Sequence, residues 1–267
     1  MKHYEQNIYR SFNADLSHLT DQELCDHFIA SQHEPRIYGP TRGDRDFLSM
    51  RWLRGSGMEI GAGMYPTPLF GNATVVYADC DEGLAYGGQT IDIGLSLDDL
   101  NFLHSLPNKY DFIVASHVLE HVDSFVRAIH NLVAAVNSGG MIYIVLPDKR
   151  FLNDKNFIRD YSFEHHKLEF TNPTIFNNVH DERYINYQSK TDDRIIHADI
   201  TPEYKAELAS GVISHKNRFL HHKHSYSFVD WINIIFDAKK YLKDSFELVD
   251  MRYGHERNDC HFVLRAF

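Results

Sequence analysis

Short apolar runs alternate with longer, helix-compatible segments through the middle of the chain. The runs have the length and composition of buried strands, which we predict near residues 57–61, 74–79, 90–93, 111–115 and 141–146. Strands that alternate with helices build a parallel sheet covered on both faces. The pattern therefore predicts an α/β fold with a Rossmann-like, doubly wound and mostly parallel sheet, in which ligands bind at the carboxyl ends of the strands.

Two further patterns frame the end of this region and the end of the chain. Residues 125–136 have helical spacing, and Gly139-Gly140 are predicted to cap that helix at its C-terminus. Residues 230–242 form an amphipathic helical pattern, and residues 246–253 and 259–265 read as two paired strands. We therefore predict that a final helix and an antiparallel hairpin complete the sheet.

The regular alternation stops between these two parts. Residues 151–225 hold eight of the eighteen histidines, and an insertion after the fifth strand can close over reacting atoms. We predict a substrate-binding lid here; the alternative is an insertion that packs against a second subunit in a homodimer. The predicted division is an N-terminal helical cap (1–54), a cofactor-binding core (55–150), the lid (151–225) and the closing helix and hairpin (226–267).

Composition and charge narrow the class of protein. The 267 residues are 43% hydrophobic, enough for a globular core, and no segment is long and apolar enough for a membrane span. The first residues lack the pattern of a secretory signal, and three widely spaced cysteines predict no disulfide framework, so a cytoplasmic protein is expected. A net charge of -10 argues against nonspecific binding to nucleic acid.

The glycine-containing stretch Met58-Glu-Ile-Gly-Ala-Gly63 is the main candidate for a cofactor site. Its two glycines follow the first predicted strand, where a parallel strand turns towards a helix and backbone must approach a ligand closely. Asp79 closes the second strand and can accept two hydrogen bonds from a ribose. Tyr65-Pro66 follows the turn and the third glycine of a dinucleotide motif is missing, so no pyrophosphate cradle is predicted.

These motifs resemble the first motif of the class I S-adenosylmethionine-dependent methyltransferases, an acid, an apolar residue and then Gly-x-Gly. The likeness continues through Asp79, Asp92 and Asp111–His121 to Gly139-Gly140, and the terminal hairpin is typical of the family's sheet. The resemblance implies S-adenosylmethionine as cofactor and S-adenosylhomocysteine as product. The cofactor-binding residues that it implies are Glu59, Gly61, Ala62, Gly63, Asp79, Asp92, Ser116 and His117.

Methyl transfer to a hydroxyl needs alignment with the donor and a base that removes the proton. Histidine and carboxylate suit that task, and the candidates are His117, His221 and Asp148. Alternatively, His117 forms an internal hydrogen-bonded cluster with Glu120 and His121, which would share a helical face with it. The candidates for binding a polar or anionic substrate are Lys149, Arg150, His165, His166, Arg218, His222 and His224.

No metal ligands are assigned from the sequence. The pair His117 and His121 has the spacing of a zinc motif but lacks the Glu of His-Glu-x-x-His. A divalent site made of His221 or His224 with Asp199 matches no established ligand spacing. The predicted cofactor site therefore includes no metal ion.

The run Pro147-Asp-Lys-Arg150 resembles a branch of the family found among bacterial enzymes that modify surface glycans. The resemblance implies a small-molecule acceptor, such as a sugar, a phosphate or a nucleotide-linked precursor of a surface polysaccharide, methylated on oxygen. Two alternatives are an NAD-dependent oxidoreductase and a catalytically inactive partner subunit with the same fold. Neither nucleic acid nor a membrane is expected as a partner.

Overall fold

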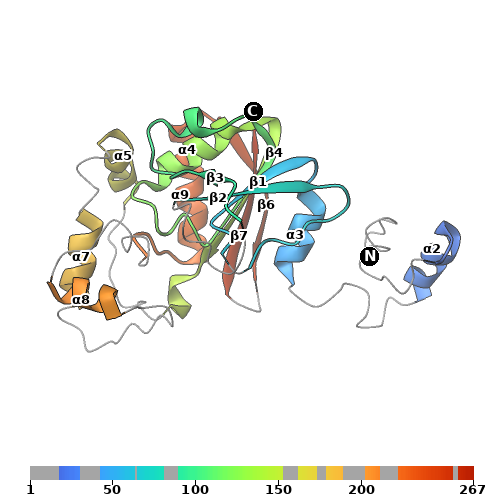
Figure 1. Cartoon of the computed structure of the whole chain (residues 1–267), viewed down its shortest axis with the longest axis horizontal. Helices are drawn as coiled ribbons and strands as arrows, with labels where there is room; N and C mark the ends of the chain where they lie inside the picture. Colours follow the sequence, from blue (N-terminus) through green and yellow to red (C-terminus); the bar gives the residue numbers. More distant parts are fainter. Residues whose placement is uncertain are drawn as a thin grey trace.

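The computed structural model describes residues 18–30, 43–63, 65–80, 90–152, 162–172, 179–188, 202–210, 222–254 and 258–267. Within these residues one sheet has the strand order β3-β2-β1-β4-β5-β7-β6 (Figure 1). The strands are β1 (Ser56–Ile60), β2 (Thr74–Asp79), β3 (Ile93–Gly94), β4 (Tyr110–Ser116), β5 (Val136–Pro147), β6 (Phe246–Tyr253) and β7 (Asp259–Ala266). Strands β1 to β5 pair in parallel with one another, and β7 runs antiparallel to both β5 and β6. The predicted fold class is confirmed.

Helices cover both faces of this sheet, as predicted. The described helices are α2 (Asp21–Ala30), α3 (Asp44–Trp52), η3 (Phe102–Ser105), α4 (Phe125–Ala135), η4 (Lys149–Phe151), α5 (Phe163–Thr171), α7 (Val179–Gln188), α8 (Pro202–Ser210) and α9 (Phe228–Tyr241). Leu48 of α3 packs with Phe112 and Tyr143 on one face, whereas Phe125 of α4 and Trp231 of α9 belong to the core on the other. Alternate residues of the buried central strands therefore contact different helices.

The sequence signals for the two long core helices are used in the structure. Ser124 caps α4 by accepting a hydrogen bond from the backbone of Arg127. Ser227 and Asp230 form a capping box at the start of α9. The indole of Trp231 donates to the carbonyl of Pro147 at 3.0 Å, which fixes α9 against the end of β5.

The helix expected directly after the glycine turn is not formed. Residues 61–63 and 65–73 contain no helix, because Pro66 and Pro68 remove backbone donors and disfavour helical geometry in the residues before them. The end of α4 also differs from the prediction. The helix ends at Ala135, and Val136 already has extended geometry and pairs with Tyr110 of β4, so Gly139-Gly140 lie within β5.

The segment predicted as a lid contributes α5, which packs on the core helices. The guanidinium of Arg127 in α4 lies 4.8 Å from the ring centroid of Phe170 in α5 and donates to the Phe170 carbonyl. Phe163 and Phe170 also make edge contacts with Tyr241 of α9. None of the helices in the described ranges is long and apolar enough to cross a lipid bilayer. At least the first part of this segment is therefore continuous with the helical layer.

Candidate cofactor and acceptor site

The glycine turn lies at the carboxyl end of β1, between β2 and the segment after β4. Gly61 has a φ of +65° and donates its N–H to the carbonyl of Ala78 at 2.9 Å. A Cβ on Gly61 would lie 2.6 Å from Cγ2 of Val118, so a side chain is excluded there. Gly63 has a φ of +51°, yet its Cβ would meet no atom of the described residues within 4 Å. This open position lets a ligand approach the backbone, so the turn fits an adenosyl cofactor.

Glu59, predicted to reach the cofactor, stabilises the turn in the structure. Its buried carboxylate accepts hydrogen bonds from the backbone N–H and the hydroxyl of Thr67, at 2.7–3.0 Å. The guanidinium of Arg45 lies 3.4 Å from the same carboxylate. Burial raises the pKa of Glu59, although these donors oppose the shift. Glu59 therefore closes the loop from residue 61 to residue 67.

The two predicted nucleoside-binding acids differ in position. Asp79 ends β2 at the same sheet edge as the glycine turn, and its Oδ1 accepts the N–H of Cys80 at 2.7 Å. Asp92 does not end a strand: β3 begins one residue later, and the Asp92 carboxylate accepts the N–H of Tyr77 at 2.9 Å. The placement of Asp92 at a strand end was wrong, because β3 begins and ends later than predicted. The role of Asp92 stays a prediction.

His117 directly follows β4 and Ser116. It has a φ of +56°, a sparsely populated geometry for a residue with a side chain that is typical of functional sites. Its Nδ1 lies 3.3 Å from Glu120 and its Nε2 lies 3.4 Å from Asp259. Burial would lower the pKa of His117, but the two carboxylates outweigh it and raise the pKa to about 10. A ring that holds both protons at neutral pH cannot accept another, so this geometry does not support His117 as the base.

Asp148, the second described candidate for the base, is also held by a cation. Its buried carboxylate pairs with the guanidinium of Arg150 at 2.6–3.1 Å and accepts the N–H of Phe228 at 3.3 Å. Burial raises the pKa of Asp148, but the hydrogen bonds from Arg150 outweigh it and lower the pKa overall. Lys149 is half exposed and lies 3.9 Å from Asp230. The residues after β5 therefore join the sheet to α9.

Three of the predicted substrate-binding histidines meet inside the protein around a residue that the sequence did not indicate, Glu169. His165 and His224 point Nε2 atoms at Oε1 of Glu169, at 2.5 and 3.1 Å. His166 contacts Oε2 at 3.0 Å, and His180 of α7 contacts Oε1 at 2.9 Å. His166, His224 and Glu169 are fully buried. Burial lowers the pKa of His224 to about 3, so this imidazole is neutral.

The spacing of His165 and Glu169 is a local sequence signal for this cluster. His165 and Glu169 are four residues apart and therefore share one face of α5. Their partners come from α7 and from the segment before α9, a pairing that the sequence does not encode locally. His222 lies apart from this group, next to His121, with ring centroids 4.9 Å apart. The candidates His221 and Arg218 lie outside the described residues.

A buried lysine joins the segment before α9 to the loop after β4. The Nζ of Lys223 lies 2.8 Å from Asp123, whose N–H donates to Asp98 at 2.9 and 3.0 Å. Lys223 and Asp123 are both buried, and burial together with the charge of Asp123 raises the pKa of Asp98. The Lys223 ammonium thus pairs with Asp123, and its charge lowers the pKa of Asp98 against these effects.

Replacing Lys223 with Met is expected to lower the free energy of unfolding by about 3–5 kcal/mol, because the buried carboxylate of Asp123 loses the ammonium group that it pairs with. Urea unfolding at pH 7 measures this loss. Lys167→Met is the matched control, since its ammonium pairs with Glu164 on the surface, and a change of at most about 1 kcal/mol is expected there. Equal effects of the two variants would contradict the assignment of a buried ion pair.

His261 of β7 predicts a pH dependence of stability. Its Nδ1 lies 2.9 Å from the hydroxyl of buried Tyr143, and burial lowers the pKa of His261 to about 4. The unfolded chain binds a proton near the ordinary pKa of about 6.5, whereas the native chain does not. Protons therefore favour the unfolded state, and the stability that neutral His261 provides is lost as the pH falls from about 6.5 towards 4.

The His261→Gln variant is expected to lose stability less steeply than the parent between pH 6.5 and 4, by at most about 1.4 kcal/mol per pH unit. Urea unfolding at several pH values measures the two slopes. His104→Gln, at an exposed position of η3, is the control and should follow the parent. A His261→Gln slope identical to that of the parent would show that this imidazole is protonated in the native state.

Comparison with known proteins shows the family. A model described as "methyltransferase domain" matches residues 44–188, more than half of the chain. No curated protein matches the sequence. Among solved structures, the chain is similar to a protein of Rhodobacter sphaeroides provisionally named a Zn-dependent alcohol dehydrogenase, with a TM-score of 0.50, 14% identity, and coverage of 84% of this chain and 90% of that one. At that identity the likeness shows the fold alone.

Two methyltransferases are among the other similar structures. The plantazolicin methyltransferase BamL, solved with SAH and a triazolic desmethylPZN analog, has a TM-score of 0.44 and 11% identity over 98% of this chain and 96% of that one. The CurJ carbon methyltransferase has a TM-score of 0.42 and 12% identity over 90% of this chain, which spans 54% of the CurJ chain. With the family match and the strand order together, the chain belongs to the methyltransferase domain family, as a class I S-adenosylmethionine-dependent methyltransferase.

Proposed function

We propose that the protein transfers a methyl group from S-adenosylmethionine to an oxygen of a small polar acceptor, such as a sugar, a phosphate or a nucleotide-linked precursor. The observation that carries the proposal is the position of the segment after β4. Val118 lies against Gly61 of the glycine turn, so the neighbouring imidazoles and Glu120 lie next to the place where the turn would hold the cofactor. An edge rich in imidazole and carboxylate groups suits a polar acceptor.

The residues of the turn have distinct tasks in this proposal. S-Adenosylmethionine supplies a methyl group on a positively charged sulfur. Gly63 leaves room for close approach of the nucleoside, and Asp79 accepts the ribose hydroxyls through the carboxylate oxygen that Cys80 leaves available. Ser116 and His117 border the methionine end, where β4 stops. Glu59 stabilises the loop through its hydrogen bonds with Thr67 and makes no direct contact with the cofactor.

A hydroxyl acceptor must lose its proton as the new bond forms. Both described candidates for the base are engaged by charged partners, His117 by two carboxylates and Asp148 by Arg150. His117 then acts as a fixed positive group that orients the acceptor or its phosphate. Half-exposed Lys149 and exposed Arg150 follow β5 and add two further cationic groups that could contact an anionic acceptor.

The acceptor class is tested with radiolabelled S-adenosylmethionine and a panel of nucleotide-linked sugars, sugar phosphates, free sugars, amines and peptides. The expected result is label in an O-methyl ether, identified by NMR, with sugars or phosphates as acceptors. Transfer to an amine or carbon acceptor, with none to oxygen, would overturn the proposal while leaving the methyltransferase family intact. The experiment also separates an inactive partner subunit, which would bind S-adenosylhomocysteine without turnover.

The oxidoreductase alternative has one structural neighbour in its favour, the Rhodobacter protein named provisionally as a dehydrogenase. A shared fold at low identity does not determine the cofactor. Calorimetric titration separates the two activities. Binding of S-adenosylhomocysteine without binding of NAD is expected, and the reverse would favour the dehydrogenase.

A further inference from the structure

Glu120 is a buried carboxylate whose two oxygens lack hydrogen-bond donors in the part of the chain that the structure describes. Its side chain is 0% exposed, and neither carboxylate oxygen accepts a hydrogen bond from the described residues. The nearest ring nitrogens are Nδ1 of His117 at 3.3 Å and Nε2 of His121 at 3.9 Å from Oε1. An isolated buried carboxylate costs several kcal/mol unless a cation compensates it. The His117 ring supplies part of that compensation, yet both oxygens still lack a hydrogen-bond donor among the described residues and are open to a ligand.

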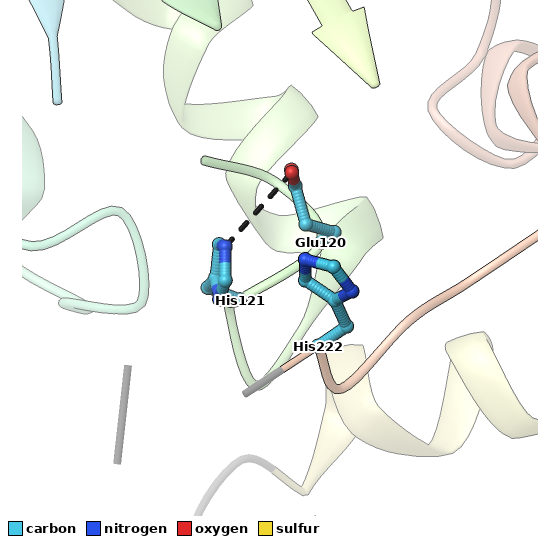
Figure 2. A group of neighbouring side chains, drawn as sticks. All are labelled: Glu120, His121 and His222. Carbon is cyan, nitrogen blue, oxygen red and sulfur yellow. Dashed lines mark ion pairs between the residues drawn. The ribbon is translucent and has the colours of Figure 1, made fainter. Parts of the chain in front are cut away.

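The groups around this carboxylate are those that bind metal ions. His121 and His222 face Glu120, and one ligand atom of each of the three residues lies within 4.8 Å of the others (Figure 2). Donors around an ion with bonds of about 2.1 Å lie roughly 3–4 Å apart, so binding would draw these side chains together by about 1 Å. Two imidazoles and one carboxylate suit first-row divalent metals and leave further coordination positions open.

The main chain holds the two parts of this site together. The carbonyl of Glu120 accepts the N–H groups of Lys223 and His224, at 2.7 and 3.0 Å. These bonds fix the segment that carries His222 against the segment that follows β4, although they are about a hundred residues apart in sequence. The site is therefore built on the core sheet. The ring of His121 is 21% exposed, which leaves the site accessible from one side.

The neighbouring cluster around Glu169 is the competing location for a metal ion, since it also contains three or more possible ligands. Its carboxylate, however, has imidazole contacts on both oxygens, at 2.5–3.1 Å. That arrangement compensates the buried charge without an ion. The imidazoles next to Glu120 lie farther away, at 3.3 and 3.9 Å from one oxygen only, which favours the group of Glu120, His121 and His222 as the metal site.

We propose that Glu120, His121 and His222 bind a divalent first-row transition metal ion beside the cofactor turn. The role of the ion rests on the proposed oxygen transfer. An acceptor hydroxyl bound at an open coordination position becomes more acidic and releases its proton to water. The oxygen then bonds to the methyl carbon as the sulfur–carbon bond breaks, and the electron pair of that bond stays on sulfur. The ion changes no oxidation state.

The test is direct binding of Co2+ to chelator-treated protein. Calorimetry measures the affinity and stoichiometry, and visible absorption reports imidazole coordination. One ion per chain is expected. Glu120→Gln, which keeps the shape of the side chain, should weaken binding by at least the roughly 10- to 100-fold that even an outer-shell partner contributes. His121→Ala is the second variant, because a partly exposed ring can be truncated without unfolding. His104→Ala, at an exposed position of η3, is the control and should bind as the parent does.

The outcomes separate this site from its competitor and from the proposed function. Loss of Co2+ binding in Glu169→Gln with full binding in Glu120→Gln would overturn the assignment, as would the absence of binding to the parent. Stoichiometric binding without methylation of any oxygen acceptor would support the site and contradict the function. Methylation that persists in protein shown to bind no ion would do the opposite.

Discussion

Replacing Gly63 with Asn is expected to weaken binding of S-adenosylhomocysteine about tenfold to a hundredfold, the equivalent of about 1–3 kcal/mol for forcing extra atoms into an occupied space. Asn is chosen because it tolerates the left-handed backbone that Gly63 adopts, with φ +51°. The fold has room for the new side chain, since no described atom lies within 4 Å of its Cβ. Only a bound ligand would meet it. Calorimetric titration measures the change.

Gly71→Asn is the matched control for this experiment. Gly71 also has a positive φ, +68°, and its Cβ would also meet no described atom within 4 Å. It lies before the start of β2, at the opposite edge of the sheet from the glycine turn. The two variants therefore share backbone strain and differ in position. Equal loss of affinity, or none in Gly63→Asn, would place the cofactor elsewhere.

Replacing Asp79 with Ala is expected to weaken binding of S-adenosylhomocysteine by about 1–3 kcal/mol, since a charged hydrogen-bond acceptor for the ribose is lost. The effect should fall on cofactor affinity with little change in the free energy of unfolding, because within the described residues the Asp79 carboxylate accepts a single backbone N–H, that of Cys80. The same titration, with urea unfolding alongside, measures both quantities.

Asp99→Ala controls for the loss of a carboxylate that accepts a local backbone N–H. The exposed Asp99 accepts the backbone N–H of Asn101 at 2.8 Å. Its replacement should leave cofactor affinity unchanged. Unchanged affinity in Asp79→Ala as well would remove Asp79 from the site.

The fold was predictable because its signals are local. Each central strand is an apolar run, and β1, β2, β4 and the terminal hairpin begin within a residue or two of their predicted positions. The core helices carry caps next to their apolar faces, as at Ser124 and Ser227. Strand boundaries with weak signals were less certain. The glycine-rich stretch before β3 has no apolar run to fix the start, which is why Asp92 was misplaced.

The groups that surround the predicted cofactor site were harder to predict, since they depend on tertiary contacts. Glu59 of β1 contacts Thr67 of the following loop and Arg45 of α3, so the three residues come from three segments of the chain. The histidines of the insertion looked exposed in a polar sequence, but His166 and His224 are buried against Glu169. Composition marks such residues as candidates, whereas only the packing of α5 against the segment before α9 shows which atoms they contact.

Charge states were equally inaccessible to sequence reasoning. His117 stands at the expected position after β4, but Asp259 comes from the distant strand β7 and makes this imidazole a stable cation. The sequence predicts Glu120 as part of a cluster with His117 and His121. His222, which comes from a distant segment of the chain, lies beside it and completes a group that could hold a metal ion. The motif therefore predicts which edge of the sheet carries the site, and long-range partners decide the charge states of the side chains there.

The most direct test of the central claim is a crystal structure with S-adenosylhomocysteine. The account predicts that the adenosyl group lies over Gly61–Gly63, with both ribose hydroxyls within hydrogen-bond distance of the Asp79 carboxylate and the sulfur facing the segment that begins at His117. Density for the ligand at any other edge of the sheet, or a ribose without contact to Asp79, would contradict it.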